Sequence, residues 1–238
     1  LPGFKYIPFN DLQSARKAIT QRTCALLVEP IQGEGGVNIA NPSYIKGLKK
    51  LCQKNGILLI FDEVQSGFGR TGKLFAYELY KTKPDIMTMA KALGGGVAIG
   101  AMASTNRVMK SFVPGTHAAT FGGNPLACSA ALASLKVITG KTFLNKVTAT
   151  GIYFLKRLQE IARKNPIVKE ARGAGMFLAL ELDQPGHEIV IDCMKQGFLI
   201  NCIQQNVLRF IPPLTISRQD IDSLVPVLSN SLTKLNDK

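Results

Sequence analysis

Residues 57–72 read ILLIFDEVQSGFGRTG, and this stretch decides the fold class. Its first five residues form a continuous apolar run, which predicts a strand that is covered on both faces, as in a parallel sheet. Two carboxylates, Asp62 and Glu63, follow at once, and a glycine-rich turn comes after them. In open α/β sheets, ligands bind beyond the carboxyl ends of the strands, so this loop is a candidate site.

Strand and helix patterns alternate around this stretch. Further strands are predicted at 24–28, 85–89 and 98–103, and helices at 42–55 and 125–138. Asn41 is expected to cap the first of these helices and Gly56 to close it. The alternation predicts a doubly wound α/β domain over residues 1–139.

The pattern changes after residue 139. A long amphipathic helix is predicted at 143–163. Short strands and two helices follow it, with strands at 168–171, 176–182, 198–201 and 207–210 and helices at 187–196 and 218–232. Ser217 and Asp220 have the spacing of a capping box for the last helix. Residues 140–238 are therefore expected to form a smaller α+β domain.

Composition narrows the classes of function. The chain is 46% hydrophobic and 19% charged, which is ordinary for a globular protein. No apolar run approaches the roughly 20 residues that a membrane helix needs.

Lysine and arginine exceed aspartate and glutamate by 29 − 16 = 13, so a nucleic-acid binder is one alternative, although no arginine-rich run or zinc-finger pattern occurs. Five cysteines without a CxxC pair and only two histidines favour reduced thiols and no metal site.

Three features near the ends of the predicted strands suit one cofactor. Lys91 follows an apolar strand and precedes three glycines, and a desolvated lysine can form a Schiff base through its free amine. Asp62, which lies 91 − 62 = 29 residues earlier, is placed to keep a ring nitrogen protonated. The polar, glycine-rich turn at 117–125 opens a helix whose N–H groups suit a phosphate. Together they suggest pyridoxal phosphate (PLP). Taken singly, each has a plainer reading: a surface lysine, a loop cap or metal carboxylate, and a flexible turn.

Several longer motifs occur in a fixed order along the chain: EPIQGEGG (29–36), FDEVQSGFGRTG (61–72), PDIMTMAKALGGG (84–96), TFGGNPLAC (120–128) and LRFIPPLTIS (208–217). In these motifs the chain resembles the class-III, fold-type-I PLP-dependent aminotransferases, over essentially all 238 residues. The resemblance implies that residues 1–139 are the C-terminal part of the large PLP-binding domain and residues 140–238 the small C-terminal α+β domain. It also implies a homodimer with its sites at the subunit interface.

The resemblance assigns roles to the matching residues. Lys91 would be the catalytic lysine, which holds the cofactor and later moves the substrate proton. The other cofactor-binding residues would be Asp62 at the pyridine nitrogen, Glu63 beside it, Val64 on the ring face, Gln65 near the phenolic oxygen and Thr120 at the phosphate. Arg209 would bind the substrate α-carboxylate, with Glu34 as its switchable partner. Ala119 stands where the family often has a serine that contacts substrate, so one hydrogen bond is expected to be missing.

The resemblance also implies an activity. We expect the δ-amino group of N2-acetylornithine to pass to 2-oxoglutarate, giving N-acetylglutamate semialdehyde and glutamate, as in arginine biosynthesis. Ornithine, 4-aminobutyrate and succinyl-diaminopimelate are alternative donors within the family, and an inactive fragment or interaction module is an alternative of another class. The expected partners are these small molecules, without nucleic acid or membrane, and the expected location is the cytoplasm, or a plastid or organelle matrix in a eukaryote.

One departure from the family concerns length. Family members carry a substantial portion before the region that matches residues 3–11. That portion supplies a phosphate loop, an aromatic side chain that stacks on PLP and a second substrate-binding arginine, and none of these is found here. We therefore expect the chain to be the C-terminal portion of a longer enzyme.

Overall fold

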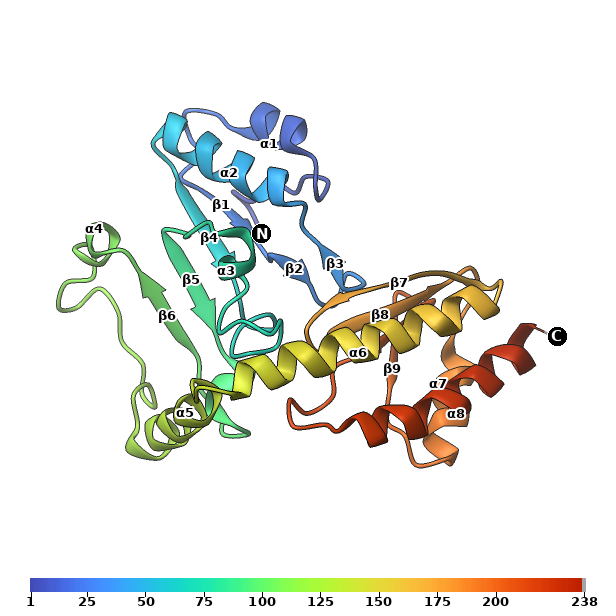
Figure 1. The fold of residues 1–238 in the computed structure, drawn as a ribbon. Helices are drawn as coiled ribbons and strands as arrows, with labels where there is room; N and C mark the ends of the chain where they lie inside the picture. Colours follow the sequence, from blue (N-terminus) through green and yellow to red (C-terminus); the bar gives the residue numbers. More distant parts are fainter. Residues whose placement is uncertain (237–238) are drawn as a thin grey trace. The chain divides into compact units, whose positions relative to one another are not determined.

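The computed structural model describes residues 1–236, which form two compact units (Figure 1). Unit 1 comprises residues 1–31, 40–68 and 75–137. Unit 2 comprises residues 32–39, 69–74 and the segment from 138 onward, so it takes in two short pieces of the first half of the chain. The boundary at 139/140 between the two domains of the family stays a prediction.

Unit 1 is built on a four-stranded sheet with the order β1-β4-β5-β6, made of Ala25–Val28, Leu58–Asp62, Ile86–Met89 and Ala101–Ser104. The first three strands are parallel, as predicted, but β6 pairs antiparallel with β5. A parallel crossover needs about a dozen residues or more. Residues 90–100 are too few and include left-handed turns at Gly95 and Gly96, so the chain reverses instead.

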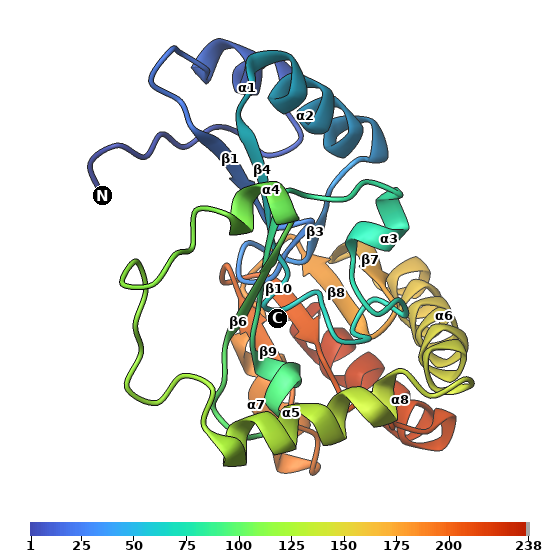
Figure 2. The ribbon, with the colours of Figure 1, turned by 90° about the vertical axis from the view of Figure 1, so that its left-hand side faces the viewer.

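Helix α2 (Pro42–Asn55) covers one face of this sheet together with α1 (Leu12–Ala18) (Figures 1 and 2). Its predicted bounds are confirmed, and Gly56 ends it in the left-handed conformation. The expected cap is not found: the Asn41 side chain makes no capping hydrogen bond, and the Asn41 backbone N–H donates to Asn10 Oδ1 at 2.8 Å. The cover on both faces that was expected for the strand at 57–61 is incomplete within unit 1, where Leu58 and Ile60 of β4 are half-buried.

The rest of unit 1 consists of short elements and one longer helix. They are α3 (Tyr77–Tyr80), the 3₁₀ turn η1 (Lys91–Gly94), α4 (Asn106–Met109) and α5 (Pro125–Ile138). The bounds of α5 agree with the predicted helix. Figure 2 shows the connection from α4 to α5 as a long extended loop outside the sheet, and its residues are exposed.

Unit 2 contains an antiparallel sheet with the order β7-β8-β10-β9. Its strands are Val168–Ala174, Phe177–Leu182, Val207–Phe210 and Asn201–Ile203. The helices α6 (Phe143–Lys164), α7 (His187–Lys195) and α8 (Arg218–Asn236) share one apolar core with this sheet. A short hairpin, β2 (Ile31–Gln32) with β3 (Asn38–Ile39), carries the glycine-rich loop at 33–37.

Two details of unit 2 test the sequence patterns. The capping box is confirmed, since Asp220 Oδ2 accepts the Ser217 N–H at 2.9 Å and Ser217 Oγ accepts the Asp220 N–H at 3.1 Å. The strand predicted at 198–201 was placed too early. Phe198 still donates its N–H to Cys193 in closing α7, so sheet pairing begins only at Asn201, opposite Arg209.

A close backbone contact locks α6 onto the turn between β7 and β8. A Cβ placed on Gly151 would lie 2.3 Å from the carbonyl oxygen of Gly175, which is a backbone atom and cannot swing aside. We expect Gly151→Ala to lower the free energy of unfolding by about 2 kcal/mol, because overpacking outweighs the gain in helix propensity. Chemical denaturation measures this. Gly47→Ala in α2 is the control, since its Cβ would meet only the flexible tip of Leu12, and an equal loss there would refute the argument.

None of the helices described between residues 1 and 236 combines the length and apolar character that a membrane crossing requires.

Candidate functional site

Asp62 is the last residue of β4, at the carboxyl edge of the unit 1 sheet. Its register partner on the parallel strand β5 is Thr88. Asp62 Oδ1 accepts the Thr88 hydroxyl at 3.2 Å and the Val64 N–H at 3.0 Å. These two hydrogen bonds, which both end on Oδ1, hold the half-buried carboxylate in place. Among the described residues neither bond uses Oδ2, so this second oxygen is available to a ligand.

Lys91 comes two residues after β5 ends, at the start of η1. Its φ is +46°, a left-handed conformation that costs a residue with a side chain of the order of 1 kcal/mol and that is enriched at functional sites. Because β4 and β5 are parallel neighbours, Lys91 and Asp62 lie at the same edge of the sheet. The burial that the sequence suggested for Lys91 is not found, since this side chain is exposed.

Glu63 is fully buried, in contrast to its neighbour Asp62. Its carboxylate accepts the backbone N–H groups of Ala76 and Tyr77 and the Ser66 hydroxyl. The side chain therefore ties the end of β4 to the start of α3. Burial raises the pKa of Glu63 to about 7, although these three donors act in the opposite direction.

The raised pKa predicts how stability varies with pH. Below about pH 4.5, Glu63 holds its proton in both the folded and the unfolded chain. Between about 4.5 and 7 only the unfolded chain releases it, so the free energy of unfolding falls as pH rises, by on the order of 3 kcal/mol. Denaturation of wild type and Glu63→Gln across this range measures the effect. The variant is expected to lack this fall, and parallel curves for the two proteins would contradict the assignment.

The remaining predicted cofactor residues of unit 1 lie in loops. Val64 and Gln65 are half-buried in the turn after β4. Ala119 and Thr120 are exposed in the loop before α5. Asn124 caps that helix, with Oδ1 accepting the Ala127 N–H at 2.9 Å, so the positive end of a 14-residue helix follows the loop.

These groups fit PLP. A fixed carboxylate suits a protonated ring nitrogen, and a lysine lies at the same sheet edge. A hydroxyl in the loop before the N-terminus of α5 suits a phosphate.

In unit 2, Arg209 of β10 and Glu34 of the loop at 33–37 form an ion pair, with Nη1 and Oε1 2.7 Å apart. The two side chains differ in exposure, at 7% for Arg209 and 71% for Glu34. Arg209 Nε also donates to Asn201 Oδ1 at 3.3 Å. Arg209 lines a mainly apolar cavity of about 460 Å³, so a buried cation is fixed beside a space that a small molecule can fill.

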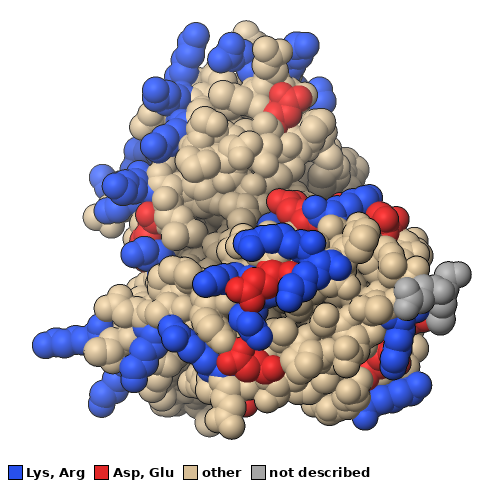
Figure 3. Space-filling view, turned by 45° about the vertical axis from the view of Figure 1, so that its right-hand side comes forward, with Lys and Arg blue, Asp and Glu red and all other residues tan. Residues whose placement is uncertain are grey.

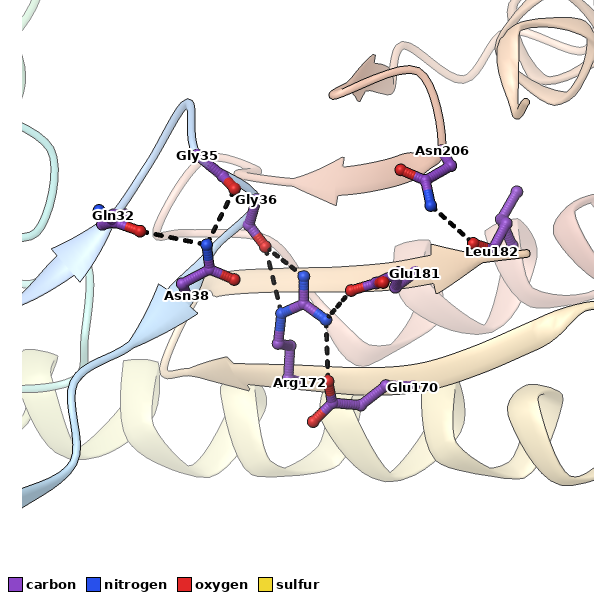
Figure 4. Close-up of polar contacts among 9 residues, drawn as sticks. All are labelled: Gln32, Gly35, Gly36, Asn38, Glu170, Arg172, Glu181, Leu182 and Asn206. Carbon is purple, nitrogen blue, oxygen red and sulfur yellow. Dashed lines mark hydrogen bonds and ion pairs between the residues drawn. The ribbon is translucent and has the colours of Figure 1, made fainter. Parts of the chain in front are cut away.

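Arg172 of β7, which none of the sequence motifs indicated, holds the same loop. Its guanidinium donates from Nε and Nη2 to the Gly36 carbonyl, at 3.2 and 2.7 Å (Figure 4). Nη1 pairs with Glu170 at 2.8 Å and with Glu181 at 2.6 Å. The available signal was an arginine between a strand pattern and two glycines, Gly173 and Gly175.

The basic charge does not gather into one patch on the face drawn in Figure 3, where acidic side chains lie among the lysines and arginines at the centre. Among residues 1–236, no group of three or more His, Cys, Asp or Glu is arranged to hold a metal ion. All five cysteines are free.

Residues 5–232 match the family model for class-III aminotransferases. The chain is 48% identical over 234 residues to an acetylornithine aminotransferase from Methanocaldococcus jannaschii, covering 98% of this chain and 59% of that protein. An ornithine aminotransferase from Toxoplasma gondii, described with partial occupancy of PLP at its active site, superposes with a TM-score of 0.94 at 35% identity, over 100% of this chain and 57% of that one. An acetylornithine aminotransferase from Elizabethkingia anophelis gives a TM-score of 0.91 at 33% identity, over 98% and 60% of the two chains. The chain therefore belongs to the class-III aminotransferases, a PLP-dependent family.

Proposed function

We propose that this protein transfers the δ-amino group of N2-acetylornithine to 2-oxoglutarate, giving N-acetylglutamate semialdehyde and glutamate. The observation that carries the proposal is the placement of Asp62 and Lys91 at the ends of two neighbouring parallel strands. The similarity to the acetylornithine aminotransferases from Methanocaldococcus jannaschii and Elizabethkingia anophelis supports this donor. The chain spans 59% of the length of the Methanocaldococcus protein, so the activity of the whole protein is part of the proposal.

PLP, when bound, supplies an electron sink for the charge that develops on the substrate carbon. Asp62 keeps the ring nitrogen protonated, and its bonds to Thr88 and Val64 fix the carboxylate for this purpose. Lys91 would hold the cofactor through its amine, and the same amine, once the substrate amine has displaced it, would take the proton from the substrate carbon. Glu63 positions Asp62 through the buried contacts with α3, since its own carboxylate is used by Ser66 and two backbone groups.

Further residues complete the proposed cofactor contacts. Val64 would pack on the ring face, and Gln65 would contact the phenolic oxygen. Thr120 binds the phosphate, and we propose that it does so across the interface of a homodimer. The proposed compartment is the cytoplasm, or an organelle matrix in a eukaryote.

Arg209 binds a substrate carboxylate, and Glu34 moves to make room for it. The donor N2-acetylornithine carries one carboxylate and 2-oxoglutarate carries two. Glu34 neutralises Arg209 while N2-acetylornithine is bound, and it leaves Arg209 free to bind a carboxylate of 2-oxoglutarate. One site can therefore accept both substrates. The low exposure of Arg209 and the high exposure of Glu34 support this division of roles. Ala119, which has no hydroxyl, contributes only a backbone and methyl contact to substrate.

The test is a titration of the PLP-loaded protein, expressed from its complete gene, with N2-acetylornithine. The cofactor's visible absorbance is expected to bleach, and 2-oxoglutarate is expected to restore it. Persistence of the band with this donor, together with bleaching by ornithine, would replace the proposed substrate by ornithine. That second candidate is supported by the similarity to the Toxoplasma gondii enzyme. 4-Aminobutyrate and succinyl-diaminopimelate are the next donors to test, and no bleaching by any of the four would overturn the aminotransferase proposal.

A further inference from the structure

Three successive backbone carbonyls of the loop at 33–37 are held by three side chains from different parts of unit 2. Gln204 Nε2, in the turn between β9 and β10, donates to the Glu34 carbonyl at 2.9 Å. Asn38 Nδ2 donates to the Gly35 carbonyl at 2.9 Å. Arg172 donates twice to the Gly36 carbonyl.

Arg172 is the strongest of the three donors. Its side chain is only 12% exposed, and its remaining nitrogen is paired with two carboxylates, those of Glu170 and Glu181 (Figure 4). A guanidinium has rigid geometry, so two carboxylates on one edge fix the direction of the other edge toward the Gly36 carbonyl. Gly36 has φ of +120°, which suits glycine, and an added Cβ would lie 3.4 Å from Arg172 Nη2.

The side chain of Glu34 contrasts with its backbone. The backbone is held at its own carbonyl and at the two that follow, whereas the carboxylate is largely exposed and bonded to Arg209. Moving the carboxylate therefore requires side-chain rotation and no rearrangement of the loop. Such a rotation takes place in picoseconds to nanoseconds for exposed side chains, faster than loop motion.

We propose that Arg172 is a positioning residue for substrate exchange: with Asn38 and Gln204 it clamps the loop at 33–37, so that the Glu34 carboxylate closes on Arg209 or leaves it by side-chain rotation alone. The inference rests on the proposed function for its consequence in catalysis. Arg172 does not contact substrate in this scheme, and it acts only through the backbone that carries Glu34.

Amide hydrogen exchange tests the clamp without any substrate. We expect Arg172→Met to speed exchange in the peptide at 32–39 at least tenfold, in the protein expressed from its complete gene. Lys169→Met, on the same strand but exposed, is the matched control and is expected to leave this exchange unchanged. Unchanged exchange in Arg172→Met would overturn the clamp, whatever the donor substrate is. Asn38→Ala, which removes only the bond to Gly35 and the neighbouring Gln32, is the second variant if Arg172→Met does not fold.

Stopped-flow absorbance of the two half-reactions tests the consequence. N2-acetylornithine needs Glu34 on Arg209, so its half-reaction is expected to slow about tenfold in Arg172→Met. The 2-oxoglutarate half-reaction, which needs Arg209 free, is expected to change less than threefold. In a Glu34→Ala background, Arg172→Met is expected to change the donor half-reaction less than twofold. Equal slowing of both half-reactions, or the same slowing without Glu34, would show a general structural role and overturn the proposal. No reaction of the wild type with N2-acetylornithine would instead count against the proposed function, and the exchange result would still decide the clamp.

Discussion

Lys91→Ala is expected to abolish covalent attachment of PLP and to lower kcat by at least about 10³-fold, the size of effect seen when a positioned proton-transfer group is lost. The anchoring amine and the proton carrier are the same group in the proposed mechanism, so one substitution removes both. Lys91 also sits in a left-handed backbone conformation at the edge where Asp62 ends its strand. Alanine at the same φ leaves the turn strained but shaped as before.

Borohydride reduction followed by peptide mass analysis measures attachment independently of activity. The wild-type peptide that contains Lys91 is expected to carry the mass of the reduced cofactor, and the variant is expected to carry none. Lys83→Ala is the control, since Lys83 is exposed and precedes β5. An unchanged visible cofactor band in Lys91→Ala, or labelling at another lysine in the wild type, would remove the basis of the assignment.

Much of the fold follows from local signals that act independently of the rest of the chain. Helix α2 begins and ends where a proline at its first turn and Gly56 in the left-handed conformation require. Ser217 and Asp220 cap α8 as their spacing predicts. These features depend on contacts within a few residues, which a sequence displays directly.

Features that depend on distant partners were not predictable in this way. The antiparallel direction of β6 follows from a connection too short to cross over, and the sequence shows the glycines but not the pairing. The late start of β9 follows from how α7 closes, which uses the Phe198 N–H. Arg172 and the Gly36 carbonyl are 136 residues apart, so the bond between them exists only in the folded protein.

The candidate site also combines features that the local sequence predicts with features that depend on distant contacts. The sequence singles out Asp62, Lys91, Glu34 and Arg209, and the structure adds the contacts that hold three of them: Asp62, Glu34 and Arg209. Asp62 and Glu63 are adjacent in sequence, yet one is half-buried with an oxygen available to a ligand and the other is buried among backbone donors. Asp62 ends β4 and Glu63 lies beyond it, so the two adjacent carboxylates have different surroundings.

Arg209→Met is expected to lower kcat/KM for 2-oxoglutarate about 10²- to 10³-fold, chiefly through KM. A bidentate pair between a guanidinium and a carboxylate makes two charge-assisted hydrogen bonds, each worth about 1.5–3 kcal/mol. Arg209 is fixed by Asn201 and by its burial, so it loses little conformational freedom on binding. Arg209→Lys is expected to recover only part of the loss, because an ammonium group lacks the planar two-pronged geometry.

Steady-state kinetics on the PLP-loaded protein measures the change in KM for 2-oxoglutarate. Cofactor absorbance checks that PLP is still bound, which separates a change in KM from damage to the fold. Removal of Arg209 leaves the Glu34 carboxylate in solvent, where it is already 71% exposed, so the free energy of unfolding is expected to fall far less than for a buried unpaired charge. Arg163→Met, an exposed arginine in the last turn of α6, is the control and is expected to keep the wild-type KM. A KM for 2-oxoglutarate that is unchanged in Arg209→Met would assign the Glu34–Arg209 pair to structure alone, because a cation that binds the substrate carboxylate cannot be removed without cost to affinity.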